Sequence, residues 1–80
     1  MHEWLLAATE RLADDTGADP ADYALTQAEI DSLLELARIA AHESGERTNA
    51  PLVCYLVGLA SERHGRDLDD TVDAVVGKAH

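Results

Sequence analysis

The 80-residue chain contains no Phe, one Trp, two Tyr, two Pro and a single Cys. With so few aromatic residues, a hydrophobic core has to be built mainly from Leu, Ile, Val and Ala. A lone Cys excludes an internal disulfide, and nothing in the cysteine usage points to an oxidising compartment. The scarcity of Pro, together with many strong helix formers, indicates an all-α fold.

Positive charge is also scarce, because 6 Lys and Arg stand against 16 Asp and Glu and the net charge is −10. Residues 1–25 alone carry a net charge of −5. Such an acidic surface repels phosphate backbones and anionic lipids, so we expect neither a nucleic-acid nor a membrane partner. No apolar run approaches the roughly 18 residues that span a bilayer, and no secretory leader is present. We therefore expect a cytoplasmic protein.

The apolar spacing predicts one domain, residues 1–80, with four helices. The first covers about residues 2–14 and places Trp4, Leu5, Ala8 and Leu12 on one face. The second has the clearest start, because Thr26 and Glu29 have the spacing of a capping box, flanked by a hydrophobic staple of Leu25 and Ile30. It ends near residue 43, and its predicted apolar face consists of Ile30, Leu33, Leu34, Ala37, Ala40 and Ala41.

The third helix is predicted to begin after Thr48 or Asn49 and to end at His64. Residues 52–60, LVCYLVGLA, are apolar or small throughout. A buried strand is the alternative, but the capping context and only two β-branched residues favour a helix. A helix that is apolar on all sides needs to be surrounded, so it is either the central helix of the domain or faces a second subunit in a homodimer.

The fourth helix is predicted over about residues 68–78, after the capping residue Asp67. Its apolar stripe consists of Leu68, Val72, Val75, Val76 and Ala79. The four helices together predict an all-α fold, a compact four-helix domain with a central apolar third helix.

The residue pattern gives little support to catalysis or metal binding. The four His stand far apart at positions 2, 42, 64 and 80, and Cys54 has no second thiol, so no metal-ligand spacing exists. Cys54 lies inside the apolar run, where a thiol usually behaves as a small hydrophobic group. No Gly-rich phosphate loop or serine elbow is present. We expect no metal, no cofactor and no enzymatic activity.

The segment AHESGERTNAPL, residues 41–52, joins the second and third helices and carries the candidate site residues His42, Glu46, Arg47 and Asn49. In one interpretation it is only a polar loop, in which Arg47 pairs with a carboxylate and Asn49 caps the third helix. In the other, free N–H groups at the start of that helix act with Arg47 and His42 to hold a small anion or a partner's carboxylate. The sequence leaves both interpretations open.

The stretches WLLAATERLADDTG and LLELARIAAHESGERTNAPLVCYLVGLA resemble a small actinobacterial helical domain family of unknown function. Its members share W-L near the start, LL-x-LAR-x-x-AH, then ER, APL and L-x-G-x-A. They occur alone or fused C-terminal to molybdenum-cofactor guanylyltransferases of the molybdopterin-guanine dinucleotide biosynthesis protein A type. In this chain the shared pattern falls on Trp4, Leu5, Leu33, Leu34, Leu36, Ala37, Arg38, Ala41, His42, Glu46, Arg47, Ala50, Pro51, Leu52, Leu56, Gly58 and Ala60.

The resemblance implies an accessory helical domain linked to molybdenum-cofactor maturation, with a guanylyltransferase-type or molybdoenzyme-maturation protein as partner. It does not imply that this chain transfers nucleotides, because 80 residues are too few for the α/β nucleotide-binding domain of such enzymes. We predict a non-catalytic accessory or protein-interaction module. The alternative is a domain that binds a small anion or cofactor fragment through the segment 42–51.

Overall fold

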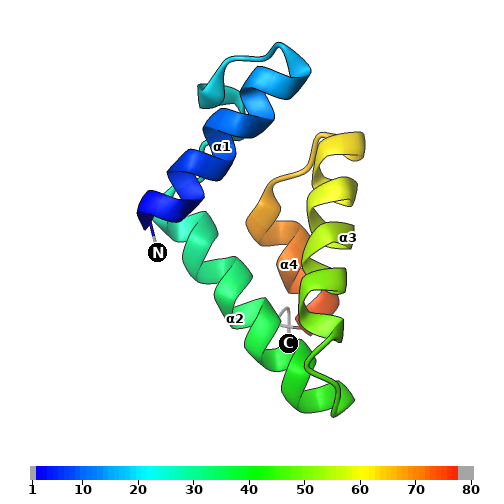
Figure 1. Cartoon of the computed structure of the whole chain (residues 1–80). Helices are drawn as coiled ribbons and strands as arrows, with labels where there is room; N and C mark the ends of the chain where they lie inside the picture. The colour runs from blue at the N-terminus through cyan, green and yellow to red at the C-terminus, as the bar shows by residue number, and fades with distance from the viewer. Residues whose placement is uncertain (1, 78–80) are drawn as a thin grey trace.

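The computed structural model describes residues 2–77 and consists of four α-helices and one short 3₁₀ helix (Figure 1). In chain order these are α1 (His2–Thr16), η1 (Pro20–Tyr23), α2 (Gln27–Ser44), α3 (Asn49–His64) and α4 (Leu68–Val76). No strand occurs among residues 2–77. The all-α class and the four predicted helices are confirmed. Ala79, assigned to the stripe of the fourth helix, lies outside the described residues.

The helix ends follow local signals in the sequence. At the start of α2 the Glu29 N–H donates to Thr26 Oγ1 at 3.1 Å, and the Thr26 N–H donates to Glu29 Oε1 at 2.8 Å. These two bonds are the predicted capping box. Gly45 ends α2 with φ of 72°, a left-handed conformation that glycine adopts without steric penalty. The Asp67 carboxylate accepts from the Asp69 N–H and so caps α4, as predicted.

The hydrophobic core lies where α2, α3 and α4 meet. Its buried residues are Leu36, Val57 and Val72, one from each of these helices. Leu33, Val53, Cys54, Leu68 and Val76 pack around them and are partly buried. A core of this size leaves a thin margin of stability, which is expected for so short a chain.

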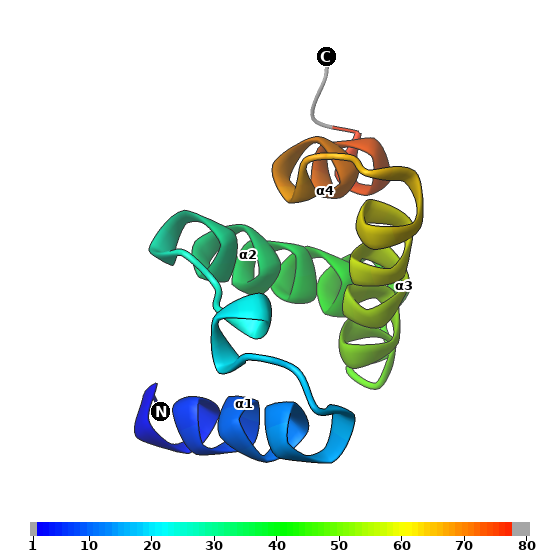
Figure 2. The ribbon, with the colours of Figure 1, turned by 90° about the horizontal axis from the view of Figure 1, so that it is seen from above.

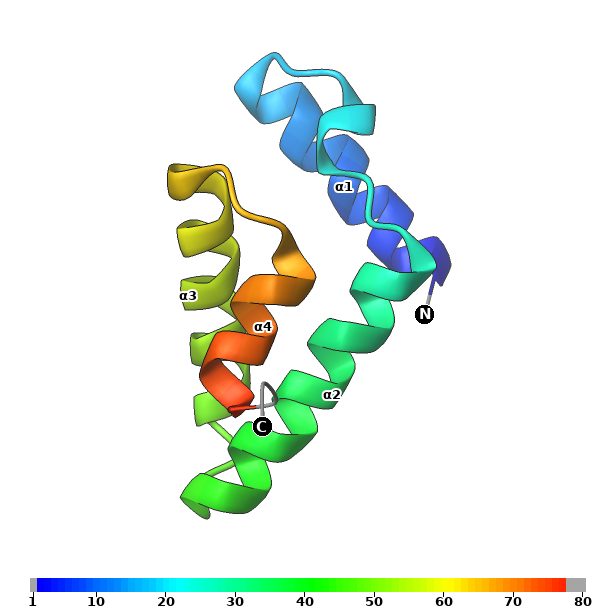
Figure 3. The ribbon, with the colours of Figure 1, turned by 180° about the vertical axis from the view of Figure 1, so that it is seen from behind.

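The first helix stands apart from this core. Among the described residues, no Cα atom of α1 lies within 8 Å of a Cα atom of α2, α3 or α4, and its contacts are with η1. Figure 2 shows α1 and α4 on opposite sides of α2, and the view from behind in Figure 3 shows α1 continuing away from the upper end of α2. The radius of gyration is 13.4 Å. An average domain of this length has about 11.6 Å, so the chain is drawn out by its first helix.

The third helix packs on one side only. It contacts α2 and α4 and buries Val57, whereas Leu52, Tyr55 and Leu56 are 61%, 67% and 58% exposed. Helices α2, α3 and α4 each contact the other two, and no further helix covers the exposed side of α3, so the predicted enclosure of the third helix is not formed within the described part of one chain. The reason is that α1, the one helix left to cover α3, packs on η1 instead.

Two predicted apolar faces are rotated from those observed. Leu36 is fully buried although it falls outside the stripe expected for the second helix, because α3 and α4 both pack on that side of α2. In α1 the packed face contains Ala13, which is 2% exposed, and Trp4 is 70% exposed. Without a helix partner, α1 turns its packed face toward η1, and Trp4 falls outside it.

Candidate functional site

The four residues of the predicted site lie at one corner of the molecule, where α2 turns into α3. His42 is in the last turn of α2, Glu46 and Arg47 are in the turn, and Asn49 is the first residue of α3. All four side chains are exposed. Within residues 2–77, Arg47 forms no ion pair, so the carboxylate partner expected for it is not seen. The four residues therefore lie at the same corner of the fold, but their side chains form no hydrogen-bond network with one another.

Few backbone N–H groups at the start of α3 are available to bind an anion. The Asn49 N–H donates to the Glu46 carbonyl and the Ala50 N–H to the Arg47 carbonyl, both at 3.1 Å, and Pro51 has no N–H. Thr48, rather than Asn49, occupies the N-cap position, and its side chain forms no capping bond. The N–H groups of Asn49 and Ala50 are thus already used within the turn. An anion at this corner would depend on the Arg47 and His42 side chains.

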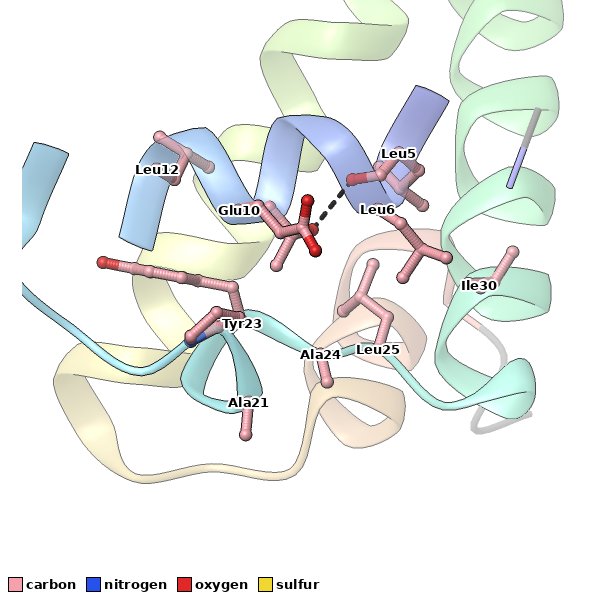
Figure 4. Close-up of a pocket in the computed structure, with 11 residues that line it drawn as sticks. Leu5, Leu6, Glu10, Leu12, Ala21, Tyr23, Ala24, Leu25 and Ile30 are labelled. Atoms are coloured by element: carbon pink, nitrogen blue, oxygen red, sulfur yellow. Dashed lines mark hydrogen bonds between the residues drawn. The ribbon is translucent and has the colours of Figure 1, made fainter. Parts of the chain in front are cut away.

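A second candidate site lies between α1, η1 and the start of α2. It is a groove of about 580 Å³, and leucines from α1 and from the segment before α2 line it (Figure 4). Leu6 and Leu12 are 64% and 53% exposed, so the groove opens to solvent. We call this the α1 groove, and its lining residues are Leu5, Leu6, Thr9, Glu10, Leu12, Pro20, Ala21, Tyr23, Ala24, Leu25 and Ile30.

Most polar groups of the α1 groove are already engaged. Thr9 Oγ1 donates to the Leu5 carbonyl at 2.9 Å, inside α1. The Tyr23 hydroxyl and Thr16 Oγ1 form a hydrogen bond of 2.9 Å that ties η1 to the end of α1. Glu10 is the charged residue in the lining, and Figure 4 shows it among the leucines of α1. The groove therefore presents apolar surface with one carboxylate, which suits an apolar occupant with a positive charge.

The segment that forms most of the α1 groove is acidic in sequence. Within residues 2–25 the acidic residues are Glu3, Glu10, Asp14, Asp15, Asp19 and Asp22, and Arg11 is the one basic residue. The net negative charge of this segment attracts a cationic partner over a distance of about 8–10 Å at ordinary salt.

Arg38 and Cys54, both in helices of the core, have a shifted pKa. A bidentate hydrogen bond from Arg38 to Glu35, with N–O distances of 2.6 and 3.1 Å, raises the pKa of the Arg38 guanidinium. Burial raises the pKa of the Cys54 thiol, whose Sγ donates to the Leu33 carbonyl at 3.8 Å. A raised pKa keeps the thiol protonated at neutral pH, which fits its packing role.

The α1 groove was not among the sites inferred from the sequence. Two signals pointed to it. Leu6 lies off the predicted stripe of the first helix, and Tyr23 and Leu25 are large apolar residues in a segment between helices. The apolar periodicity of the helices could not predict that these three residues lie together, because the groove forms only when η1 folds back onto α1.

Residues 2–77 contain neither a candidate metal site nor a candidate membrane-spanning helix. No group of three His, Cys, Asp or Glu side chains within that range lies close enough to hold a metal ion. None of the described helices combines the length and the apolarity needed to cross a bilayer.

Comparison with known proteins gives a family but no function. Neither a curated protein nor a solved structure matches the chain. A family match covers all of residues 1–80, including the α1 groove and the corner between α2 and α3. The chain therefore belongs to the family described as Domain of unknown function (DUF6457).

Proposed function

We propose that this chain is a non-catalytic protein-interaction domain that binds an apolar, positively flanked helix of a partner protein in the α1 groove. The observation that carries the proposal is the groove itself, an apolar hollow of about 580 Å³ between α1, η1 and the start of α2. Helices with one apolar face are common occupants of such grooves.

The exposed surface of the chain supports a protein partner. The accessible area is 6065 Å². A folded monomer of 8.6 kDa has on average about 4,700 Å², so this chain exposes roughly 1,400 Å² more than the average. Large exposed side chains on α1 include Trp4, Leu6 and Leu12. Apolar surface left in water is unfavourable, and contiguous patches of it mark interaction sites.

The carboxylate in the groove and the acidic segment around it define the chemistry of the partner. Glu10, in the lining, would face charges that flank the apolar stripe of an incoming helix. Lys or Arg at these flanking positions would be attracted, whereas Glu or Asp would be repelled. We infer that the partner helix is amphipathic and basic.

The family resemblance suggests the identity of this partner protein. We propose a molybdenum-cofactor guanylyltransferase or a molybdoenzyme-maturation protein, in the cytoplasm of an actinobacterial cell. The support is the shared pattern of residues such as Arg38, His42 and Arg47, together with the fusion to those enzymes that the resemblance implies. In this proposal the chain supplies a docking surface and the partner carries out the chemistry.

Anion binding at the corner between α2 and α3 is the second candidate. It is favoured by the exposed Arg47, which forms no ion pair within the described residues. It is weakened by the engaged N–H groups of Asn49 and Ala50. A phosphate titration followed by amide NMR tests it: shifts that saturate at Arg47 and Asn49 would support the site, and no shift at millimolar phosphate would exclude it.

The groove is tested with a labelled helical peptide as long as α1, carrying a Leu stripe flanked by Lys. We expect saturable binding, measured by fluorescence anisotropy, which weakens as salt is added. A peptide with Glu in place of Lys should bind at least about tenfold more weakly. Leu6→Glu should abolish binding, because it places a charge in the groove. Val75→Glu is the matched control: Val75 is also exposed, at 51%, but lies on α4, across α2 from the groove (Figure 2).

The outcomes test two claims separately: that the α1 groove binds a partner helix, and that this partner is a molybdenum-cofactor maturation protein. Equal binding of the Lys and Glu peptides, or binding that survives Leu6→Glu, would remove the groove from the function. Capture of a molybdenum-cofactor maturation protein from native extract by the wild type and Val75→Glu, but not by Leu6→Glu, would support the named partner. Capture of that protein by the wild type and both variants would support the named partner but place its contact outside the α1 groove.

A further inference from the structure

We propose that a second copy of this chain covers the exposed side of α3, with the two α3 helices antiparallel across a two-fold axis. This surface lies on a different helix from the α1 groove and is independent of the proposed partner. Helix α3 forms one edge of the molecule (Figure 1), and Leu52, Tyr55 and Leu56 on it are more than half exposed. With the partly buried Leu59 they follow the spacing i, i+3, i+4, i+7, which places them on one helix face.

This face carries no charge. From Asn49 to Ser61 the chain has no Asp, Glu, Lys or Arg, although these residue types make up 28% of the sequence. A helix that faces water normally carries charged residues on its exposed side. Depletion of charge with enrichment in Tyr and aliphatic residues is typical of the centre of a protein interface. The exposed side of α3 therefore has the composition of a contact surface.

A two-fold axis between Tyr55 and Leu56 makes the face complementary to itself. In an antiparallel pair about this axis, Leu52 lies opposite Leu59 of the second copy, and Leu56 lies close to its own counterpart. Gly58 has no side chain to hold the two helices apart, and the space beside it is open, since a Cβ built there would meet no atom within 4 Å. The hollow of about 800 Å³ beside Tyr55 and Gly58 leaves further room.

The charged residues at the two ends of the face decide the orientation. Glu62 lies about 10 Å from the axis along α3, and Arg47, in the turn before α3, lies about 13 Å from it on the other side. An antiparallel pair brings Glu62 of one copy near Arg47 of the other, and Arg63 near Glu46. A parallel pair would place like charges together and align the helix dipoles unfavourably. Opposite charges thus meet at both ends of the antiparallel pair.

The surplus exposed area of the whole chain exceeds what one side of a dimer interface needs. A standard interface takes about 800 Å² from each partner, and the chain as a whole, including α1, exposes roughly 1,400 Å² beyond the average for its mass. The net charge of −10 opposes association, but half of it lies in residues 1–25, of which Asp22 and Tyr23 border the hollow beside Tyr55 and Gly58. Repulsion between charges farther apart than about 8–10 Å is largely screened at ordinary salt.

The test is the molar mass of the full chain in solution, by light scattering or sedimentation, from low to high micromolar concentration. We expect a dimer that dissociates on dilution. Leu56→Glu should give a monomer with an unchanged helical spectrum, because it places two carboxylates at the axis. Leu6→Glu, on the α1 groove, should remain dimeric. A wild type that is monomeric throughout, or a Leu56→Glu variant that still dimerises, would overturn the proposal.

Charge exchange tests the orientation. Arg47→Glu should weaken the dimer by about threefold to tenfold, since a repulsive pair replaces an attractive one at each end. Adding Glu62→Arg to the same chain should restore the original dissociation constant. If the double variant is no tighter than Arg47→Glu, the antiparallel arrangement is wrong. Peptide binding to the α1 groove should be unchanged in Leu56→Glu, so failure of the dimer and failure of the proposed function are read separately.

Discussion

Ser32 and Asp69 tie α2 to α4 across 37 positions of sequence: Ser32 Oγ donates a hydrogen bond to Asp69 Oδ1 at 2.5 Å. The bond is partly buried at the edge of the core, and its acceptor is a carboxylate. We predict that Ser32→Ala lowers the free energy of unfolding by about 1–2 kcal/mol, as expected for a bond to a charged group that is only partly buried. Urea unfolding followed by circular dichroism measures it.

The control for that prediction is Gln27→Ala. Its amide also bonds to a carboxylate, Asp31, at 2.9 Å, but on the exposed surface of a single helix. Such a bond contributes about 0.5 kcal/mol or less. Equal effects of the two substitutions would show that the link between α2 and α4 adds nothing to the stability.

The centre of the core should be sensitive to lost volume. Leu36 is fully buried between α3 and α4, and Leu36→Ala should destabilise the chain by about 2–5 kcal/mol. In a domain this small, that is enough to populate the unfolded state under native conditions. Leu34→Ala, two residues away at a side chain that is 53% exposed, should change stability by less than about 1 kcal/mol. Thermal unfolding of both variants compares them, and a similar loss in each would contradict the observed core.

The capping box of α2 can be tested against the unused cap of α3. Thr26→Ala removes the acceptor of the Glu29 N–H and should cost about 1 kcal/mol. Thr48 occupies the equivalent position before α3, but its side chain makes no capping bond, so Thr48→Ala should be close to neutral. Urea midpoints of the two variants give the answer. A greater loss from Thr48→Ala would mean that α3 starts differently from the structure described.

The thiol of Cys54 should react slowly in the folded protein. Burial raises its pKa, so at pH 8 a smaller fraction is thiolate than in an unfolded chain. We expect slow labelling by a disulfide reagent under native conditions and fast labelling in urea. The folded state holds the proton more tightly, so this residue's contribution to stability is fully present below the unfolded pKa and is lost as pH rises from there through the higher folded pKa. Cys54→Ser, with no reactive thiol, is the blank, and equal rates with and without urea would refute the partial burial of this side chain.

The helices themselves could be predicted from the sequence because their signals are local. Thr26 and Glu29 are three residues apart, and the capping box they form depends only on the start of α2. The same is true of Asp67 before α4 and of Gly45 after α2. The general location of the polar corner, with His42 and Arg47, also followed from where the helices end. Its chemistry did not, because hydrogen bonds within the turn use the donors that an anion would need.

The amino-acid sequence by itself determined that this protein is helical, acidic, poor in cysteine and apolar along the whole of residues 52–60. The tertiary structure alone decided which side of each helix is buried. It placed Leu36 and Val57 inside, left Tyr55 and Leu56 exposed, and formed the α1 groove by packing α1 on η1. The physical reason is one of range. Caps and periodicity act within a few residues, whereas burial depends on how a helix packs against segments that are distant in sequence.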